Sequence, residues 1–383
     1  MNIGIDARWI FPEMSGIGTY TRELIRHLVL LDRINEYELF FDRLQVAEQT
    51  AAAARLGEAP NFHVRHVPFG PFAPHGQVRL PALLRDLKLD VFHSPNYMIP
   101  LLAFGTQKPS RRRLKCIVTI HDLIPLLFPE HTPKALKVRF LPVFRWILRQ
   151  VGARADLILT VSESSRRDVL RELRIPPARQ DTVVAVPNGV APEYRPAAKK
   201  PLGYRTILYV GRFDPYKNIP GLLETFRQVT QRMRENVRLR IVGSPDPRYP
   251  EAAARAKELG IDGRVEWAGY MAGADLVKAY QQADVFVLPS KYEGFGLTVL
   301  EAMACGTPVV CSRRSSLPEV AGQAAVLVDP DNPGEMADAL VRVLGDPQLA
   351  ASLRDKGMSQ AAKFTWARTA AMTLKAYEFA VKG

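Results

Sequence analysis

The sequence contains few cysteines and no long run of apolar residues. Its three cysteines, Cys116, Cys305 and Cys311, have neither the spacing of a metal or redox motif nor the density of a disulfide scaffold. We therefore expect buried thiols in a chain that works in the reducing cytoplasm. The most apolar segments, Leu123–Phe128 and Phe140–Leu148, are far shorter than the ~20 residues that a membrane-spanning helix needs. No such helix is expected.

Acidic residues are scarce in the first half of the chain. Residues 1–200 contain 29 lysines and arginines but only 19 acidic residues, and residues 101–150 alone carry a net charge of +8. This excess predicts an anionic partner: a membrane surface, a phosphorylated lipid or an acidic glycan. No helix-turn-helix, zinc-finger spacing or aromatic–basic signature accompanies the charge, so no nucleic-acid partner is expected. The apolar run at Met1–Asp6 lacks a basic leader and ends before Arg8, which argues against a signal peptide.

Short β-branched runs alternate with longer amphipathic stretches along the 383 residues. This length favours two domains, and the alternation favours βα units with parallel sheets. We therefore predict an α/β fold of two Rossmann-like, doubly wound domains. The first series of expected strands is Asn2–Asp6, Tyr37–Phe41, Asn61–Val67, Asp90–His93, Cys116–His121, Asp156–Val161 and Thr182–Val186. The second series is Thr206–Gly211, Arg238–Val242, Arg264–Trp267, Val285–Leu288, Pro308–Cys311 and Ala325–Val328.

A segment rich in proline and charge separates the two series. Residues 191–204 show no apolar period, which is typical of a linker. We predict an N-terminal domain over residues 1–190 and a C-terminal domain over residues 205–364. Ligands of doubly wound domains bind at the carboxyl ends of the strands, so a central cleft that both domains face is the expected active site.

Residues 291–306, with the sequence KYEGFGLTVLEAMACG, form the most informative segment. They follow the expected strand Val285–Leu288 and pass through a glycine loop into a helix that begins near Gly296. Glycines let a backbone approach a ligand, and the N–H groups of a first helical turn bind phosphate. No Ser, Thr, Asp or Asn caps this helix, so a ligand oxygen is able to do so. The alternative is an ordinary turn in which Glu293 and Glu301 are solvated.

Two further segments repeat the pattern of strand, loop and helix start. The first, residues 208–218, carries Arg212 and Lys217, and two cations in such a loop suit a diphosphate. Their alternative is a pair of surface cations near a turn. The second lies near the start of the chain and contains Gly16 and Gly18. The alternative for this segment is an ordinary helix start.

Two polar motifs follow expected strands. His121 and Asp122 stand at the end of an apolar strand, where reactive groups lie in this architecture, although a structural histidine is the alternative. Asp329 and Asp331 form an Asp-x-Asp pattern between a strand and a helix start. We interpret that pattern as a turn and expect no metal site there.

A basic region surrounds an apolar stretch in the first half of the chain. A basic amphipathic helix of this kind is suited to an anionic membrane, and the alternative is a packed helix with a charged outer face. A peripheral contact with the inner face of the plasma membrane is therefore one expectation. The cations are Arg111, Arg112, Arg113, Lys115, Lys134, Lys137, Arg139, Arg145 and Arg149, and the apolar residues are Phe140, Leu141, Phe144, Trp146 and Ile147.

Together these segments resemble the retaining GT-B glycosyltransferases of family 4, also called group 1, and especially the bacterial mannosyltransferases of polysaccharide assembly. Glu293 and Glu301, separated by seven residues within EGFGLTVLEAMACGTPVV, are the most specific match. VGR and KN within residues 210–218, PNGV at 187–190 and WAGY at 267–270 match as well, in the order of the family. The resemblance covers essentially the whole chain.

The resemblance implies a donor site in the C-terminal domain and acceptor contacts mostly in the N-terminal one. The expected catalytic residues are Glu293 at the donor sugar, His121 near that sugar, and Arg212 and Lys217 at the diphosphate. Glu301 is expected at the ribose. The complete donor-binding set is Gly16, Gly18, Gly211, Arg212, Lys217, Gly243, Gly269, Tyr270, Glu293, Gly294, Phe295, Gly296, Leu297, Thr298 and Glu301. A final helix, residues 365–383, is expected to pack on the N-terminal domain. The loop at Ser15 departs from the family, because many members have adjacent glycines there.

The implied reaction moves a hexose from a nucleotide diphosphate to a hydroxyl of a glycan or lipid-linked acceptor, with retention and with no metal or other cofactor. GDP-mannose is the first expectation for the donor, because DVFHSPNY at 90–97 and TIHDLIP at 119–125 resemble mannosyltransferases, and UDP-sugars come next. No nucleophile is evident, so same-face attack assisted by the donor phosphate is expected. The alternatives are a sugar-nucleotide epimerase of this architecture and a non-catalytic scaffold that binds sugar nucleotides.

Overall fold

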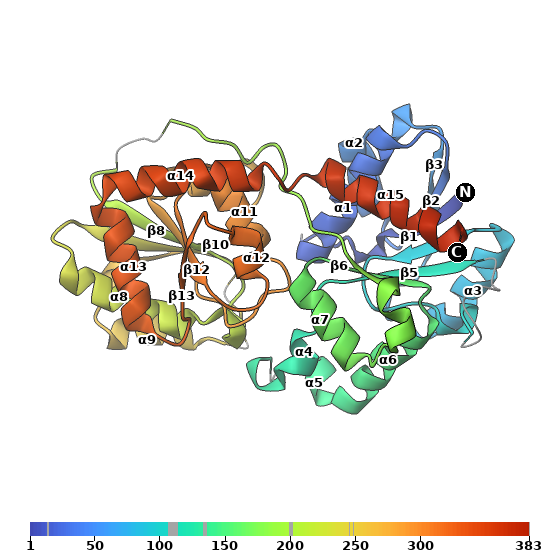
Figure 1. Cartoon of the computed structure of the whole chain (residues 1–383), viewed down its shortest axis with the longest axis horizontal. Helices are drawn as coiled ribbons and strands as arrows, with labels where there is room; N and C mark the ends of the chain where they lie inside the picture. Colours follow the sequence, from blue (N-terminus) through green and yellow to red (C-terminus); the bar gives the residue numbers. More distant parts are fainter. Residues whose placement is uncertain are drawn as a thin grey trace. The chain divides into compact units, whose positions relative to one another are not determined.

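The chain folds into two compact units. The computed structural model describes residues 1–13, 15–105, 114–132, 136–198, 202–244, 246–247 and 249–382. The first unit comprises Met1–Leu126, Phe140–Gly189 and Trp366–Gly383, and the second comprises Leu127–Arg139 and Val190–Thr365. Each unit is a parallel sheet with helices on both sides (Figure 1). The predicted α/β class with two doubly wound sheets is confirmed.

The first unit is built on a sheet whose described strands follow the order β3-β2-β1-β4-β5-β6-β7. The direction of winding reverses between β1 and β4, and such a reversal opens a crevice at the carboxyl ends of the strands. The strands are β1 (Asn2–Asp6), β2 (Glu36–Phe41), β3 (Phe62–His66), β4 (Val91–Ser94), β5 (Lys115–Ile120), β6 (Leu157–Thr160) and β7 (Val183–Ala185). The helices are α1 (Gly16–Leu31), α2 (Leu44–Ala54), α3 (Gly76–Asp86), α4 (Ile124–Leu127), which ends at the unit boundary, α6 (Leu141–Arg154), α7 (Glu163–Glu172) and α15 (Trp366–Lys382).

The second unit repeats the design with the order β10-β9-β8-β11-β12-β13, so its winding reverses between β8 and β11. Its strands are β8 (Arg205–Val210), β9 (Val237–Val242), β10 (Val265–Gly269), β11 (Val285–Leu288), β12 (Val309–Ser312) and β13 (Val326–Val328). Its helices are α5 (Leu136–Arg139), α8 (Ile219–Arg232), α9 (Glu251–Glu258), α10 (Gly273–Gln282), α11 (Leu297–Ala304), α12 (Leu317–Ala321), α13 (Pro333–Gly345) and α14 (Pro347–Ala361). Short 3-10 helices are η1 (Ala7–Trp9), η2 (Leu56–Glu58), η3 (Leu101–Ala103), η5 (Pro129–His131), η6 (Pro177–Thr182), η7 (Pro215–Lys217) and η8 (Asp262–Arg264).

The hydrophobic pattern explains these elements. Every residue of β5, β11 and β12 is buried, as expected for parallel strands that are covered on both faces. In α8 the buried residues Leu222, Phe226 and Val229 recur at helical spacing, and this face packs against α13. The helix α1 begins where the Ser15 hydroxyl accepts a hydrogen bond from the Gly18 N–H at 3.1 Å.

The two ends of the chain meet in the first unit. The helix α15 packs on α1, and the buried Tyr377 bonds the Nδ1 atom of His93 in β4 at 2.6 Å. Residues 127–139, which the sequence placed in the N-terminal domain, group with the second unit, where the Phe128 ring lies 5.3 Å from that of Tyr292. Among the described residues, no helix is both long and apolar enough to cross a bilayer.

Candidate active site

Three neighbouring strands of the second unit end at glycines. The Gly211 N–H donates to the Val242 carbonyl at 3.0 Å, and the Gly243 N–H donates to the Gly269 carbonyl at 2.8 Å. A Cβ atom on Gly243 would lie 2.0 Å from the Gly211 carbonyl oxygen, so the two strand ends approach this closely only because position 243 is glycine. The carboxyl ends of these strands therefore present backbone atoms rather than side chains, and the half-exposed Tyr270 ring lies beside them.

The loop after β11 is held by two serines from the turn between β12 and α12. The Ser316 hydroxyl donates to the carbonyls of Glu293 at 2.9 Å and of Phe295 at 2.8 Å, while the Glu293 N–H donates to the Ser315 hydroxyl at 2.8 Å. The loop ends at Gly296, whose φ of 104° suits glycine. These bonds fix residues 293–296 at the carboxyl ends of the strands, beside the point where the winding reverses.

The helix α11 begins directly after this loop. In the described part of the chain no side chain caps it, and its first residues are Leu297 and Thr298. The N–H groups of a first helical turn lack intrahelical partners and carry the positive end of the helix dipole. The start of α11 is therefore able to accept an anionic group, and the phosphate site predicted there stays a prediction.

Lys217 and Glu293 form an ion pair at the carboxyl ends of the same strands. The Lys217 Nζ atom lies 2.6 Å from the Glu293 Oε1 atom, and the two side chains are only 13% and 11% exposed. The lysine is held in place by η7, because the following residue, Asn218, adopts φ 60° and donates through its side chain to the Pro330 carbonyl at 2.6 Å. Two residues that are distant in sequence thus meet as one charged pair.

Arg212 follows Gly211 and extends toward solvent. Its Nε atom lies 2.8 Å from the Asp214 Oδ2 atom, its side chain is 67% exposed, and that of Asp214 is buried. The Arg212 carbonyl also accepts a hydrogen bond from the buried Tyr209 hydroxyl at 2.8 Å. Its backbone is therefore fixed, while the guanidinium group keeps donors that can reach an anionic ligand.

Glu301, the fifth residue of α11, is partly buried and is not solvated as an ordinary surface carboxylate would be. Its Oε2 atom accepts a hydrogen bond from the buried Tyr280 hydroxyl at 2.8 Å. Burial raises the pKa of Glu301 to about 7, against hydrogen bonds from Tyr280 and Tyr194 that lower it.

The remaining predicted residues belong to the first unit. His121 follows β5, and its Nε2 atom lies 3.0 Å from the Pro95 carbonyl oxygen. Because a carbonyl only accepts, Nε2 carries the proton and Nδ1 keeps a lone pair. Burial lowers the pKa of His121 to about 4, although the Pro95 carbonyl opposes the shift. The Tyr20 ring of α1 packs edge-on against this imidazole at 4.8 Å.

Gly16 and Gly18 lie in the first turn of α1. Gly16 is exposed and Gly18 is buried, and the Gly18 N–H is already bonded to the Ser15 hydroxyl. The structure therefore gives this helix its own cap, in contrast to α11.

Asp329 and Asp331 form a turn held by cations. Arg314 pairs with Asp329 at 3.0 Å and with Asp331 at 2.7 Å, and Lys291 pairs with Asp331 at 3.1 Å. Burial acts to raise the pKa of Asp331, but the bonds from Lys291 and Arg314 lower it overall. No group of potential metal ligands occurs among the described residues.

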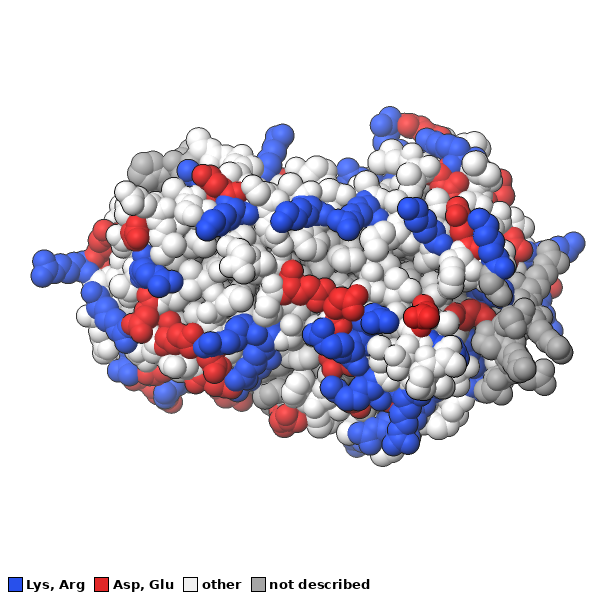
Figure 2. Space-filling model, in the orientation of Figure 1, with Lys and Arg blue, Asp and Glu red and all other residues white. Residues whose placement is uncertain are grey.

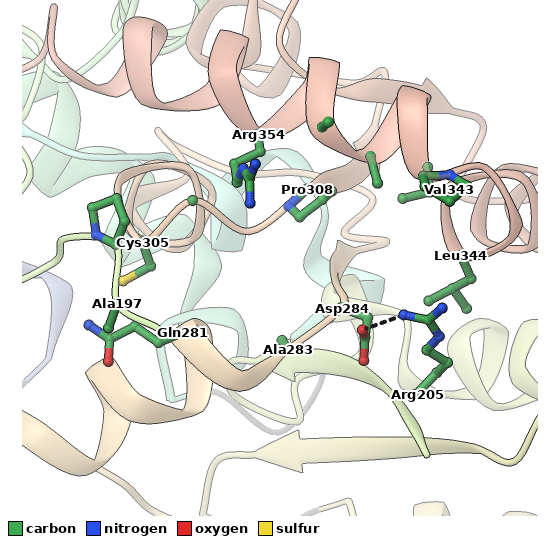
Figure 3. A pocket seen from close by; sticks show the side chains of 15 residues that line it. Ala197, Arg205, Gln281, Ala283, Asp284, Cys305, Pro308, Val343, Leu344 and Arg354 are labelled. Carbon is green, nitrogen blue, oxygen red and sulfur yellow. Dashed lines mark hydrogen bonds and ion pairs between the residues drawn. The ribbon is translucent and has the colours of Figure 1, made fainter. Parts of the chain in front are cut away.

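A pocket of about 350 Å³ lies at the opposite end of the same sheet (Figure 3). Its residues Arg205 and Asp284, which form an ion pair at 3.2 Å, stand at the amino ends of β8 and β11. Cys305 and Arg354 line it as well. Because Arg212, Lys217 and Glu293 follow the carboxyl ends of the strands, this pocket is separate from these three residues.

Sequence reasoning missed the residues that hold the predicted ones in place. Ser315 and Ser316 were detectable as a polar pair at a strand end. Tyr280 and Tyr194 carried no such signal, because a tyrosine in an amphipathic helix and one in a linker indicate packing and not a carboxylate partner.

Comparison with known proteins gives the family. Models of "Glycosyl transferases group 1" and "Glycosyltransferase Family 4" match residues 190–360 and 14–194. O-antigen chain mannosyltransferase B of Escherichia coli is 30% identical, over 95% of this chain and 96% of its own length. Sucrose-phosphate synthase from Thermosynechococcus elongatus has a TM-score of 0.78 at 22% identity, over 99% of this chain and 98% of its own.

HepE of Anabaena, solved with UDP-glucose, has a TM-score of 0.75 at 17% identity, over 98% of this chain and 99% of its own. These structural likenesses confirm the GT-B fold that the sequence motifs predicted. The chain belongs to the group 1 glycosyltransferases of family 4, and the resemblance drawn from its motifs is confirmed.

Proposed function

We propose that this enzyme transfers mannose from GDP-mannose to a hydroxyl of a glycan or lipid-linked acceptor during surface polysaccharide synthesis. The transfer retains the anomeric configuration and uses neither a metal nor another cofactor. The name of the Escherichia coli relative supports mannose and a polysaccharide product. The UDP-glucose bound by HepE supports a nucleotide sugar as donor and makes UDP-sugars the second candidate.

The Lys217–Glu293 pair carries this proposal. An ammonium group has three N–H donors, so with one engaged by Glu293 at 2.6 Å two remain for the oxygens of a diphosphate. Glu293 keeps a second carboxylate oxygen, which is able to accept from hydroxyls of the donor sugar. A cation for the leaving group and an acceptor for the sugar thus stand side by side.

Charge stabilisation at the diphosphate is the catalytic role that we assign to this site. As the bond from the anomeric carbon to the diphosphate breaks, negative charge gathers on the departing phosphate. Lys217, Arg212 and the start of α11 would bind that charge, and such fixed groups need no reorganisation during the reaction. Same-face attack follows, with the donor phosphate assisting removal of the acceptor proton.

The same charges support a metal-independent reaction. Two protein cations and a helix N-terminus supply positive charge where many transferases use a divalent ion. Asp329 and Asp331 are neutralised by Arg314 and Lys291, which supports their interpretation as a turn. We expect a chelator such as EDTA to leave turnover unchanged.

The test is transfer of labelled mannose from GDP-mannose to lipid-linked or polysaccharide acceptors, with the linkage of the product determined by NMR. An α-linked mannoside with stoichiometric release of GDP supports the proposal. Conversion of the donor without any acceptor and without release of GDP would instead indicate an epimerase. Nucleotide-sugar binding without turnover under any acceptor condition would indicate a scaffold.

We further propose that the exposed face of α6 contacts the cytoplasmic side of an anionic membrane, where a lipid-linked acceptor would lie. Phe140, Val143 and Trp146 are 51%, 54% and 54% exposed, while Phe144 and Leu148 on the other face are buried. In the described part of the chain, no carboxylate pairs with Arg145 or Arg149. Figure 2 shows Lys and Arg side chains gathered in the region where Figure 1 draws α6 and α7.

The structure also narrows this surface. Lys115 begins β5 and is buried, so the expectation that it contributes to the basic surface is wrong. The basic amphipathic helix expected from the sequence is not continuous. It is interrupted at Phe140, because Pro142 at the start of α6 has no backbone N–H to bond the preceding turn. Arg111, Arg112, Arg113 and Lys134 lie outside the described residues, as does the side chain of Lys137.

Co-sedimentation with phosphatidylglycerol vesicles at low salt tests the contact. The wild-type protein should pellet with these vesicles but not with phosphatidylcholine vesicles, and R145Q/R149Q should weaken binding, since each arginine contributes about 1 kcal/mol near such a surface. Trp146→Ala should also weaken binding, and Phe379→Ala, which removes a similarly exposed aromatic ring from α15, is its matched control. Absence of binding to anionic vesicles would contradict the contact.

A further inference from the structure

Two tyrosines from different segments face the carboxylate of Glu301. Tyr280 lies in α10, is fully buried, and donates to the Oε2 atom at 2.8 Å. Tyr194 lies in the segment that joins β7 to β8, is partly buried, and lies close enough to Glu301 for its hydroxyl to favour the ionised carboxylate. The two phenol rings pack edge to face with centroids 5.9 Å apart. The carboxylate is thus approached from a helix and from the linker.

Further bonds fix both tyrosines. The Tyr280 carbonyl accepts a hydrogen bond from the Thr307 hydroxyl at 2.7 Å, which ties the end of α10 to the segment that leads into β12. The neighbouring Gln281 side chain donates to the Arg195 carbonyl at 2.8 Å, and so holds the linker beside Tyr194. The two phenol groups are therefore placed by the fold and do not depend on a bound ligand.

A carboxylate that receives phenol hydrogen bonds differs from a solvated one in two respects. Its plane is fixed, so its remaining lone pairs have a set direction, and its ionised form is favoured. Here burial and the charge of Glu193 disfavour ionisation, while Tyr280 and Tyr194 favour it. A vicinal diol donates two hydrogen bonds and requires an ionised, correctly oriented acceptor.

We propose that Tyr280 and Tyr194 are positioning residues that hold Glu301 ionised and aimed at the 2′- and 3′-hydroxyls of the donor ribose. The inference rests on the proposed function and on the ribose contact that the family resemblance implies for Glu301. It adds that the linker itself completes the nucleotide site. The effect of either tyrosine should therefore depend on the ribose hydroxyls and should vanish when those are absent.

The experiment compares affinity for GDP with affinity for 2′,3′-dideoxy-GDP by calorimetry. Wild-type protein should bind GDP at least about tenfold more tightly, because hydrogen bonds to a charged group are among the stronger ones. Tyr280→Phe and Tyr194→Phe should each weaken GDP binding several-fold and leave dideoxy-GDP binding unchanged. Tyr204→Phe is the matched control, since that ring packs under Arg238 away from Glu301 and should behave as wild type.

The pH dependence gives a second readout. Affinity for GDP should fall as pH drops through the pKa of Glu301, about 7, because the protonated carboxyl accepts poorly. The groups that face it are Tyr194, Tyr280, Glu193 and Cys305. Removing a tyrosine hydroxyl raises that pKa, so the loss should begin at a higher pH, and affinity for GDP should recover at pH 9.

The outcomes separate the two claims. If wild-type protein binds neither GDP nor UDP, the proposed function fails and this inference falls with it. If it binds GDP and dideoxy-GDP equally well, the ribose contact of Glu301 is wrong. If it discriminates between them while both Tyr→Phe variants discriminate equally well and keep the wild-type pH profile, the positioning role is overturned.

Discussion

Replacing Lys217 with methionine separates the structural and catalytic roles of the charged pair. Methionine keeps most of the side-chain volume and removes the charged ammonium group with its three N–H donors. Glu293 then remains as an unpaired carboxylate with an 11% exposed side chain. Breaking a buried ion pair by removing one partner costs about 3–5 kcal/mol. Because this pair is slightly exposed, we expect a loss of unfolding free energy at the lower end, about 3 kcal/mol.

Catalysis should suffer independently of stability. Removing one fixed group that stabilises developing negative charge lowers kcat by about 100- to 1,000-fold. The double variant Lys217→Met/Glu293→Gln eliminates the unpaired charge as well. It should therefore recover most of the unfolding free energy and stay inactive, because the cation for the diphosphate is still missing.

Urea unfolding and single-turnover donor cleavage measure the two effects on the same protein. Glu293→Gln alone is the matched control, since it leaves the lysine unpaired and keeps the cation. If Lys217→Met retained wild-type turnover, the assignment of Lys217 to the diphosphate would be refuted. If the double variant recovered activity together with stability, the pair would be structural only.

Three further predictions concern other residues. Gly243→Ala should destabilise the protein by at least about 2 kcal/mol, because its Cβ would lie 2.0 Å from the Gly211 carbonyl; an unchanged urea midpoint would contradict this. Arg212→Ala should change stability by less than about 0.5 kcal/mol, since the side chain is 67% exposed, yet lower kcat about 100-fold; equal turnover would remove it from the site. Burial lowers the pKa of His93 to about 3, and the charge of His121 lowers it further. As pH falls below 6.5, this histidine therefore binds a proton in the unfolded chain but not in the folded one. Unfolding free energy should therefore drop with falling pH by up to about 1.4 kcal/mol per unit from this group, and His93→Gln should flatten the profile; an unaltered slope would count against it.

Local sequence pattern was enough to predict the sheets. Parallel strands buried on both faces are nearly continuous apolar runs, so Val285–Leu288 and Asn2–Asp6 were predicted with the bounds that β11 and β1 have. The glycine loop and uncapped helix after β11 were predicted on the same basis. Strand order was less accessible, because it depends on which buried runs pair and not on what each run contains.

Side-chain partners could not be predicted in the same way. The Lys217–Glu293 bond joins residues 76 positions apart, and the Tyr280–Glu301 bond joins two helices. Nothing in either local sequence indicates the other partner. The burial of Lys115 was also missed, because a lysine among arginines suggests a charged surface, whereas its alkyl chain here lies at the start of β5.

Calorimetric titration with GDP, UDP, ADP and dTDP tests whether the strand-end site of the second unit binds a nucleotide diphosphate. We predict micromolar binding of one nucleotide, GDP before UDP, weakened at least about tenfold in Arg212→Ala and Lys217→Met. His121→Asn, whose imidazole belongs to the other unit, should leave nucleotide affinity unchanged. Failure of all four nucleotides to bind, or binding that neither substitution weakens, would rule out a nucleotide site at these strand ends.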